Sequence, residues 1–518
     1  MDRVGCGSRR PRRVRSCRAA SACACTIRSS TPPTLAELAR LTGGRTEGAA
    51  DTRVTGATHD SRRVQPGDLY AAIPGFERDG HDFIGAAAAA GAAAVVVQRD
   101  GAWPLPALIV DEVRAVLGPV AQAVYGDPTA GLQVVGITGT NGKTTTSFLT
   151  AAVLGAARAA EVAILGTLGL RRGDRTVPTG FTTPEAPDLA RLFAELAADG
   201  VAAVAMEVSS HALALGRVGG MHWAAGAFTN LSPEHLDFHH SLEAYGEAKL
   251  TFFRQLADQG AFAVVNADDA WGERFRAAGP PGTWRFSLED SGVEVYAERF
   301  DSAPDGSVLT VRTPAGRFET RLALAGRFNA ANALAAAALG VGLGMAPEAV
   351  GDALGGVPRV PGRYEVYHGG GVTVIVDYAH TPLAFERILT TVRASGAAAV
   401  WCVFGCGGER DRSKRPEMAR LAGRLADVVF VTVDNPRREP VEQIMADTLA
   451  GLTGSPARWE RVDDRAAAIH RAISEAAPGD VVCLLGKGDE AYQMIGTVKE
   501  SFSERDEAQR ALAARAGA

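Results

Sequence analysis

Residues 139–145 read GTNGKTT and follow an apolar run, LQVVGI at 132–137. Backbone N–H groups of such a loop and of the following helix N-terminus bind phosphate oxygens, a lysine neutralises charge there, and a threonine hydroxyl can bind Mg²⁺. The usual glycine spacing would place glycine at 137, where this chain has Ile137. The stretch still predicts a polyphosphate site made by Gly139, Thr140, Asn141, Gly142, Lys143, Thr144 and Thr145.

Two other polar residues follow apolar, strand-like runs. Glu207 comes after VAAVAM, and His235 lies in TNLSPEHLDFHH. Singly, each is more often a surface or capping residue than a ligand. Together with Thr144, they supply oxygen and nitrogen donors that suit magnesium ions bridging phosphates.

The elements that must position these residues follow a regular alternation. After residue 30, short β-branched runs alternate with Ala/Leu-rich helical segments, which predicts an α/β fold with mostly parallel sheets. Polar stretches such as EVSSH, DYAHTP, GCGGERD, DNPR and GKGDE follow the runs, where an α/β sheet presents its ligand edge. Three blocks emerge, 31–128, 129–357 and 358–518.

Composition indicates a globular protein. The 518 residues are 46% hydrophobic, and the formal net charge is −5. This charge gives no overall positive potential that would attract nucleic acid. No apolar run reaches the roughly 20 residues of a membrane span. Cys402, Cys406 and Cys483 lie in or beside apolar runs, as buried thiols do in a reducing compartment. We therefore expect a cytoplasmic protein.

Residues 1–30 are rich in Arg and Ser and contain four further cysteines. We expect a disordered extension, with an organelle transit peptide as the alternative. A metal site formed by these cysteines is a weaker alternative because further His or spaced Cys pairs are missing.

An ordered set of motifs across residues 31–510 resembles the Mur ligases, the ATP-dependent amide-bond-forming enzymes of peptidoglycan precursor synthesis. The motifs are TGTNGKTTT, EVSSH, FTNLSPEHLDFH, EAKLTFF, GRFNAANALAA, PGRYE and DYAHTP. The resemblance implies three α/β domains, which bind a UDP-muramoyl peptide (31–128), ATP in a central P-loop ATPase domain (129–357) and an amino acid in a C-terminal Rossmann-like domain (358–518). We expect a monomer.

The resemblance also implies ATP and Mg²⁺ as cofactors and an acyl-phosphate mechanism. Lys249 in EAKLTFF matches the family's carbamylated lysine; a carbamate is an anionic oxygen ligand, whereas an ammonium would repel magnesium. The implied catalytic residues are Lys143, Lys249, His235 and Arg363. The implied metal ligands are Thr144, Glu207, His235 and carbamylated Lys249. Asn329 and Asp377 join the phosphate loop in the ATP site, and His380 is a catalytic or structural neighbour.

For the UDP-muramoyl peptide, hydroxyl and guanidinium groups suit pyrophosphate, sugar and carboxylate oxygens. The residues implied are Ser61, Phe76, Glu77, Arg78, Thr182, Thr183, Ser209 and Arg217. Leu215 departs from the polar residue that some relatives carry.

The third block resembles the diaminopimelate-adding Mur ligases, which attach this amino acid to the D-glutamate of UDP-N-acetylmuramoyl-L-alanyl-D-glutamate. Diaminopimelate has a distal carboxylate and ammonium, which Arg437 and Glu490 could pair; lysine would leave the guanidinium unpaired. The implied amino-acid-binding residues are Arg410, Asp434, Asn435, Pro436, Arg437, Gly486 and Glu490.

Two departures from the family pattern leave alternatives open. Asp489 replaces the usual histidine of GKGHE, and RREP replaces an Asp-containing turn. Asp489 could favour an extra substrate cation, but we expect it to face solvent. The alternatives are a paralogue that adds lysine or another amino acid, or uses another acceptor, and a catalytically silent scaffold.

Overall fold

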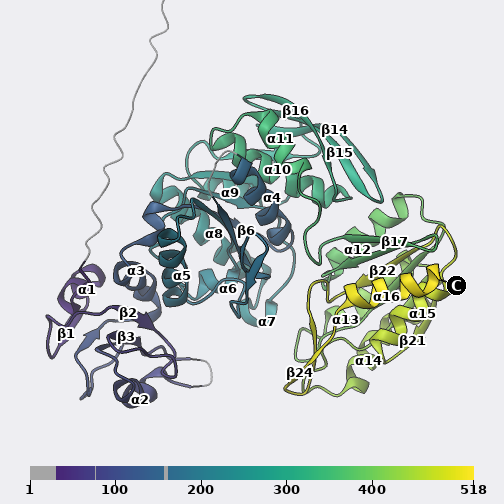
Figure 1. The fold of residues 1–518 in the computed structure, drawn as a ribbon. Helices are drawn as coiled ribbons and strands as arrows, with labels where there is room; N and C mark the ends of the chain where they lie inside the picture. The colour runs from purple at the N-terminus through teal and green to yellow at the C-terminus, as the bar shows by residue number, and fades with distance from the viewer. Residues whose placement is uncertain (1–30, 76–77, 157–160, 518) are drawn as a thin grey trace, which may run out of the picture.

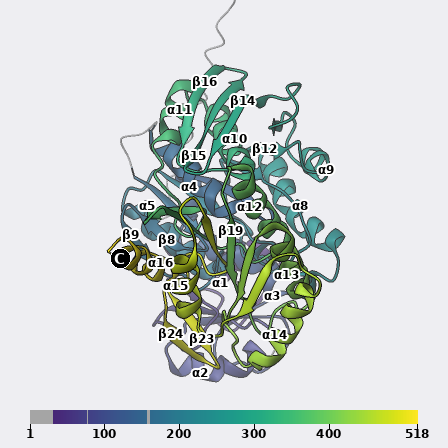
Figure 2. The same cartoon turned by 90° about the vertical axis from the view of Figure 1, so that its right-hand side faces the viewer.

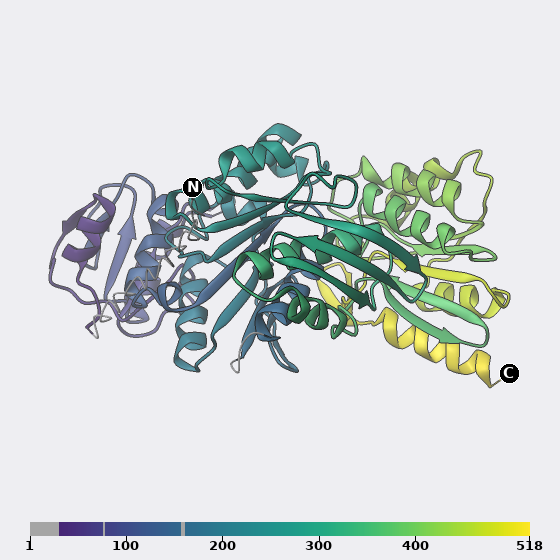
Figure 3. The ribbon, with the colours of Figure 1, turned by 90° about the horizontal axis from the view of Figure 1, so that it is seen from above.

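The computed structural model describes residues 31–75, 78–156 and 161–517, which form three α/β units in a row (Figures 1 and 3). The extension expected at 1–30 lies outside the described residues, as do Phe76 and Glu77. Within the described ranges, no helix is long and apolar enough to cross a membrane.

The first unit is a five-stranded sheet in the order β1-β5-β4-β3-β2, parallel except for β1. Helices α1 and α3 cover one face and α2 the other. The elements are α1 (Leu35–Thr42), β1 (Arg45–Glu47), β2 (Gly56–Thr58), β3 (Asp68–Ala71), η1 (Gly80–Phe83), α2 (Ile84–Ala89), β4 (Ala94–Val97), β5 (Ala107–Ile109), α3 (Val113–Val124) and η2 (Pro128–Gly131).

The central unit contains an eleven-stranded sheet in the order β16-β15-β14-β13-β12-β11-β6-β10-β7-β8-β9. Its elements are β6 (Gln133–Thr138), α4 (Lys143–Ala156), β7 (Val162–Gly166), β8 (Gly169–Arg172), β9 (Arg175–Val177), α5 (Ala186–Ala198), β10 (Ala203–Glu207), α6 (Ser210–Ala214), β11 (Ala225–Phe228), α7 (Leu236–His239), α8 (Leu242–Gln259), β12 (Phe262–Asn266), α9 (Gly272–Ala278), β13 (Trp284–Ser287), β14 (Val295–Ala303), β15 (Gly306–Thr313), β16 (Gly316–Leu322), α10 (Arg327–Gly342) and α11 (Pro347–Gly355).

Parallel strands form the middle of this sheet, and antiparallel hairpins extend both ends. The seven neighbouring strands β14-β13-β12-β11-β6-β10-β7 run parallel to one another, as predicted. Strands β15 and β16 at one end, and β8 and β9 at the other, pair antiparallel. Helices α4 and α10 pack on one face, and α5 and α8 on the other. The Ala-rich α10 is buried on most sides, since small side chains let neighbouring elements approach closely.

The third unit is a six-stranded sheet, β17-β18-β22-β19-β20-β21, parallel except for β17, with a separate β23-β24 hairpin (Figure 2). Helices α12 and α13 cover one face, and α15 and α16 the other. The elements are β17 (Glu365–Gly369), β18 (Val372–Asp377), α12 (Pro382–Ala394), β19 (Val400–Phe404), α13 (Lys414–Leu425), β20 (Val428–Val431), α14 (Val441–Leu449), η3 (Ala450–Leu452), β21 (Arg458–Arg461), α15 (Arg465–Glu475), β22 (Val481–Leu485), β23 (Tyr492–Ile495), β24 (Val498–Ser501) and α16 (Glu504–Ala516).

Candidate active site

The phosphate loop, residues 139–145, connects β6 to α4. Gly139 and Gly142 have φ values of +145° and +87°. A Cβ would lie 2.0 Å from Thr229 Oγ1 at position 139 and 2.3 Å from Asn332 Oδ1 at position 142. Both positions therefore require glycine. Ile137, at the position where the usual spacing has glycine, is instead buried within β6.

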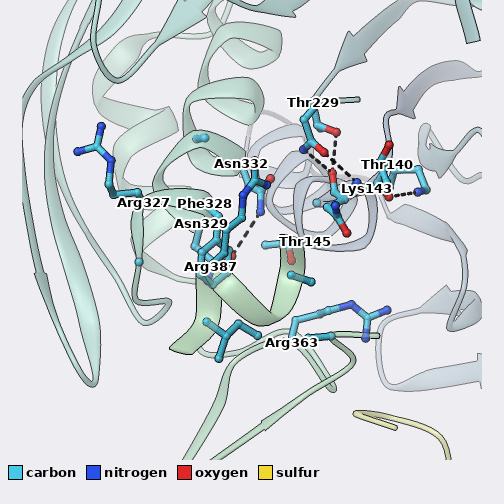
Figure 4. A pocket seen from close by; sticks show the side chains of 18 of the residues that line it. Thr140, Lys143, Thr145, Thr229, Arg327, Phe328, Asn329, Asn332, Arg363 and Arg387 are labelled. Carbon is cyan, nitrogen blue, oxygen red and sulfur yellow. Dashed lines mark hydrogen bonds between the residues drawn. The ribbon is translucent and has the colours of Figure 1, made fainter. Parts of the chain in front are cut away.

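Lys143 is the first residue of α4, and its side chain folds back over the loop (Figure 4). Its Nζ donates to the carbonyl oxygens of Gly139 at 3.0 Å and Thr140 at 2.8 Å. Burial lowers its pKa. The loop backbone thus holds the lysine amine where the helix N-terminus also favours anions.

Glu207, at the end of β10, is 1% exposed and binds the phosphate loop directly. Its Oε1 accepts hydrogen bonds from Thr144 Oγ1 and from Thr167 N–H, both at 2.9 Å. Gly166 leaves the space, because a Cβ there would lie 2.1 Å from the same carboxylate oxygen. Two of the predicted metal ligands, Thr144 and Glu207, are therefore adjacent.

Lys249 in α8 lies beneath the same loop. It is 1% exposed, and its Nζ donates to the Gly139 carbonyl at 2.8 Å. Burial, with a smaller contribution from Lys143, brings its pKa well below the ordinary value. His235 lines the same cavity, and burial lowers its pKa to about 4. Both side chains are therefore favoured in their neutral forms.

Magnesium fits this donor set on one condition. Thr144 and Glu207 offer the oxygen ligands that Mg²⁺ prefers, and neutral His235 offers a nitrogen. Lys249 fits only as a carbamate, whose formation requires the neutral amine that its burial favours. Throughout 31–75, 78–156 and 161–517, no three His, Cys, Asp or Glu side chains converge on a metal site. The predicted set uses a hydroxyl and a modified lysine instead.

A cavity of about 900 Å³ extends from the phosphate loop to α12 of the third unit. Asn329 lies at the start of α10, where its Nδ2 donates to the Ala325 carbonyl at 2.9 Å and its Oδ1 accepts from Asn332 at 3.3 Å (Figure 4). Asp377 accepts hydrogen bonds from the N–H groups of Tyr364 and Ala379, both at 2.7 Å, and burial raises its pKa to about 6.

Arg363 approaches the phosphate loop from the start of the third unit. Its Nη2 donates to Thr144 Oγ1 at 3.3 Å, and its Nη1 donates to Asp489 Oδ1 at 2.9 Å. Burial disfavours the charged form of Arg363. The nearby carboxylates, with Asp489 contributing most, outweigh this effect and raise the pKa of Arg363. The expectation that Asp489 faces solvent is wrong, because the Gly486–Glu490 loop passes directly beside residues 362 and 363.

The residues predicted to bind the UDP-muramoyl peptide fall into two groups. Thr182 and Ser209 line the cavity, while buried Thr183 donates to the Glu207 carbonyl at 2.9 Å. Arg217 donates to the Thr183 carbonyl at 3.0 Å and pairs with Glu185 at 2.9 Å. Away from the cavity, Ser61 and Arg78 belong to the first unit.

The residues predicted to bind the amino acid converge at the carboxyl edge of the third sheet. Asn435 donates to Glu490 at 2.8 Å, and buried Lys487 donates to Glu490 at 3.0 Å and lies 3.5 Å from Asp434. Pro436 and Gly486 belong to the same loops.

Two arginines lie in the loops after β19 and β20, at the same carboxyl edge as Glu490 in the loop after β22. Arg437 Nη1 donates to the Gly408 carbonyl at 2.7 Å. A Cβ on Gly407 would lie 3.2 Å from Arg437 Nη1 and 3.7 Å from Arg410 Cγ, so both arginine side chains pass the same glycine.

The sequence did not predict several residues that support the loops at the carboxyl edge of the third sheet. Glu439 of the RREP turn binds fully buried Arg415 through both carboxylate oxygens at 2.7 Å and accepts from Glu409 N–H at 2.8 Å. Glu504 in α16 accepts from Gly488 N–H at 3.1 Å and pairs with buried Arg465 at 2.6 Å. Lys487, Asn332, Arg415 and Glu439 lay within stretches already singled out in the sequence, whereas Arg465 and Glu504 lay outside all of them.

Comparisons with known proteins agree across the chain. Residues 53–128 match the model of the Mur ligase family catalytic domain, 137–340 that of the Mur ligase middle domain, and 362–488 that of the Mur ligase glutamate ligase domain.

Curated relatives match at similar length. The UDP-N-acetylmuramoyl-L-alanyl-D-glutamate–2,6-diaminopimelate ligase of Geobacter metallireducens is 43% identical over 91% of this chain and 97% of its own length. The ligase of the same name from Synechococcus elongatus is 44% identical over 91% and 96%.

Among solved structures, a ligase of that name superposes with a TM-score of 0.68 at 31% identity, covering 93% of this chain and 99% of its own. The crystal structure of MurF ligase from Thermotoga maritima in complex with ADP shares the fold, with a TM-score of 0.60 at 18% identity over 90% and 98% of the two chains.

Proposed function

Because this chain belongs to the Mur ligase family, we propose that it is an ATP-dependent ligase that adds 2,6-diaminopimelate to the D-glutamate of UDP-N-acetylmuramoyl-L-alanyl-D-glutamate. The observation that carries the amino-acid assignment is that Arg410, Arg437 and Glu490 share one carboxyl edge of the third sheet. The units 31–128, 129–357 and 358–518 bind the UDP-linked acceptor, ATP and the amino acid in this proposal. The protein works as a monomer in the cytoplasm.

The proposed reaction proceeds in two steps. A carboxylate oxygen of the D-glutamate attacks the γ-phosphorus of ATP, and ADP leaves, giving an acyl phosphate. The diaminopimelate amine then attacks the acyl carbon, and inorganic phosphate leaves as the nitrogen loses a proton. Positioning and charge neutralisation account for most of the catalysis of such a transfer.

Lys143 and the loop N–H groups neutralise and orient the phosphates in this proposal, and Arg363 stabilises charge on the transferring group. Thr144, Glu207, His235 and carbamylated Lys249 would hold magnesium, which supplies positive charge to the phosphate oxygens. The contact between Lys249 Nζ and the Gly139 carbonyl supports this role, because a carbamate there would lie next to the phosphate loop.

The charges at the sheet edge favour diaminopimelate over lysine. Lys487 already lies between Asp434 and Glu490, so the two arginines add positive charge that only a distal carboxylate would balance. Lysine lacks that carboxylate and would leave a desolvated guanidinium unpaired, a loss that discriminates on the order of a hundredfold or more.

A phosphate-release assay tests the proposal. Purified protein, ATP, Mg²⁺ and the UDP-muramoyl dipeptide should release phosphate when diaminopimelate is added, and much less with lysine. Release with lysine alone would identify a paralogue that adds another amino acid. A folded protein that releases none with any amino acid would be a silent scaffold.

The paralogue alternative was motivated by Asp489 and Leu215, with the RREP turn as a further departure from the family pattern. In the structure, Asp489 binds Arg363 and Glu439 binds Arg415. Because both acids already have arginine partners, the departures do not favour an extra cation on the substrate.

A further inference from the structure

Asp489 joins two parts of the third unit that are 126 residues apart. Its Oδ1 lies 2.9 Å from Arg363 Nη1, and the side chains of Arg363 and Asp489 are 14% and 17% exposed. Partial burial makes this charged hydrogen bond stronger than one at an open surface.

Asp377 and Glu207 also act on Arg363 electrostatically, but its other direct contacts are with neutral groups. Its Nη1 also donates to the Gly362 carbonyl at 2.9 Å, its Nη2 donates to Thr144 Oγ1 at 3.3 Å, and its guanidinium carbon lies 4.6 Å from the Tyr378 ring centre. Asp489 binds one edge of the guanidinium, so another edge remains directed at the phosphate loop.

The backbone fixes the two partners relative to each other. A Cβ on Gly362 would lie 2.2 Å from Asp489 N, so position 362 packs directly on the Gly486–Glu490 loop. Tyr378 N–H donates to the Gly362 carbonyl at 2.9 Å, and Gly488 N–H donates to Glu504 at 3.1 Å. Since both backbones are held, the short Asp489 side chain can determine where the long Arg363 side chain points.

We propose that Asp489 is a positioning residue that orients the Arg363 guanidinium toward the phosphate loop before phosphoryl transfer. The proposal rests on the proposed function, in which Arg363 stabilises the transferring group. A free arginine side chain samples many rotamers, and ordering it in advance removes that entropic cost from the chemical step. The Asp489 carboxylate also attenuates the positive charge of Arg363. A correctly placed guanidinium nevertheless stabilises the transferring phosphoryl group more than a mobile one does.

Glu490, the next residue, is held independently of Asp489. Its carboxylate accepts hydrogen bonds from Asn435 and Lys487 on the amino-acid side of the loop. Loss of the Asp489 carboxylate should therefore affect the phosphate side of the site and leave amino-acid binding intact.

Steady-state kinetics of five variants test this separation. Asp489→Ala should lower kcat by about tenfold or more while the KM for diaminopimelate stays within about twofold. Asp489→Asn, which keeps an acceptor oxygen, should lose less. The double variant Arg363→Lys with Asp489→Ala should be no slower than Arg363→Lys alone, because the two residues act as one unit. Glu500→Ala, at an exposed position of β24, is the matched control.

Three kinetic results would overturn the proposal: an unchanged kcat for Asp489→Ala, losses that multiply in the double variant, or a rise in the KM for diaminopimelate without a fall in kcat. Thermal melting checks that each variant folds. If Asp489→Ala does not fold, the same three kinetic criteria are applied to Asp489→Asn.

A crystal structure of the Asp489→Ala variant provides a readout that does not depend on turnover. The Arg363 guanidinium should leave Thr144, and an unchanged position would contradict the positioning role. If the parent protein releases no phosphate with any amino acid, the proposed function fails, and this structure still decides whether Asp489 positions Arg363.

Discussion

His380 Nε2 lies 3.0 Å from Glu234 Oε1, and this contact joins the start of α12 to the loop after β11. Glu234 is also close to Lys143, and although burial acts to raise its pKa, His380 and the neighbouring cations lower it below the ordinary value. Together with the Arg363–Thr144 hydrogen bond, the pair connects the third unit to the phosphate loop.

We predict that the pair contributes to turnover by holding the two units together. Glu234→Gln and His380→Gln should each lower kcat/KM, and the double variant should lose less than the product of the two losses. A coupling on the order of 1 kcal/mol, or roughly fivefold, is expected for a partly exposed pair. Strictly multiplicative losses would contradict the coupling. Glu442→Gln, which breaks an exposed ion pair of α14, is the control.

Lys249 is predicted to carry a carbamate. With ¹³C-labelled bicarbonate, the parent should show a carbamate carbon signal by NMR that Lys249→Ala lacks. The variant should lose at least a hundredfold in activity, because an anionic ligand next to the phosphate loop disappears. Lys499→Ala, at an exposed position of β24, should keep both the signal and the activity. A fully active Lys249→Ala would refute the assignment.

Arg437 is predicted to select the distal carboxylate of the amino acid. Arg437→Ala should raise the KM for diaminopimelate by about a hundredfold, and it should reduce the preference over lysine because no guanidinium remains to be left unpaired. Arg438→Ala changes the adjacent, exposed arginine and should behave like the parent. Kinetics with both amino acids measure the ratio; an unchanged ratio in Arg437→Ala would rule out this contact.

The pair between Glu439 and Arg415 predicts a pH-dependent contribution to stability. The hydrogen bond from Arg415 lowers the pKa of Glu439 from 4.5 to about 2. A lowered folded-state pKa means that the stabilisation is complete above about pH 4.5 and is lost as the pH falls through about 2.

Glu439→Gln should therefore destabilise the protein by about 1–3 kcal/mol at pH 7. In thermal denaturation, the difference between parent and variant should shrink as the pH falls from 5 toward 2. A difference that is constant or grows over this range would contradict the prediction. Glu417→Gln in α13, an exposed acid, is a suitable control.

The parallel strands of the central and third units could be predicted because each combines β-branched residues with a polar stretch at its carboxyl end. The runs VVGI, VAILG and FAVVN became β6, β7 and β12. The antiparallel strands β15 and β16 were missed, as was β14, with which β15 pairs. The alternating polar residues of β15 and β16 reflect one exposed face and resemble irregular surface segments when read alone.

The phosphate loop could be predicted because local residues make it, whereas the groups that hold it come from elsewhere. Asp489 lies 126 residues from Arg363, and Glu439 lies 24 residues from Arg415. Such pairs depend on which loops meet in three dimensions. No local spacing encodes them, so the default expectation for Asp489 was wrong.

The hydrogen bond from Gly488 N–H to Glu504 means that α16 supports the Gly486–Glu490 loop. During synthesis, the phosphate loop leaves the ribosome well before residue 504. A nascent chain can therefore form that loop before Glu504 is made, and the Gly486–Glu490 loop, with the Asp489 that orients Arg363, gains this support only at a later stage of translation.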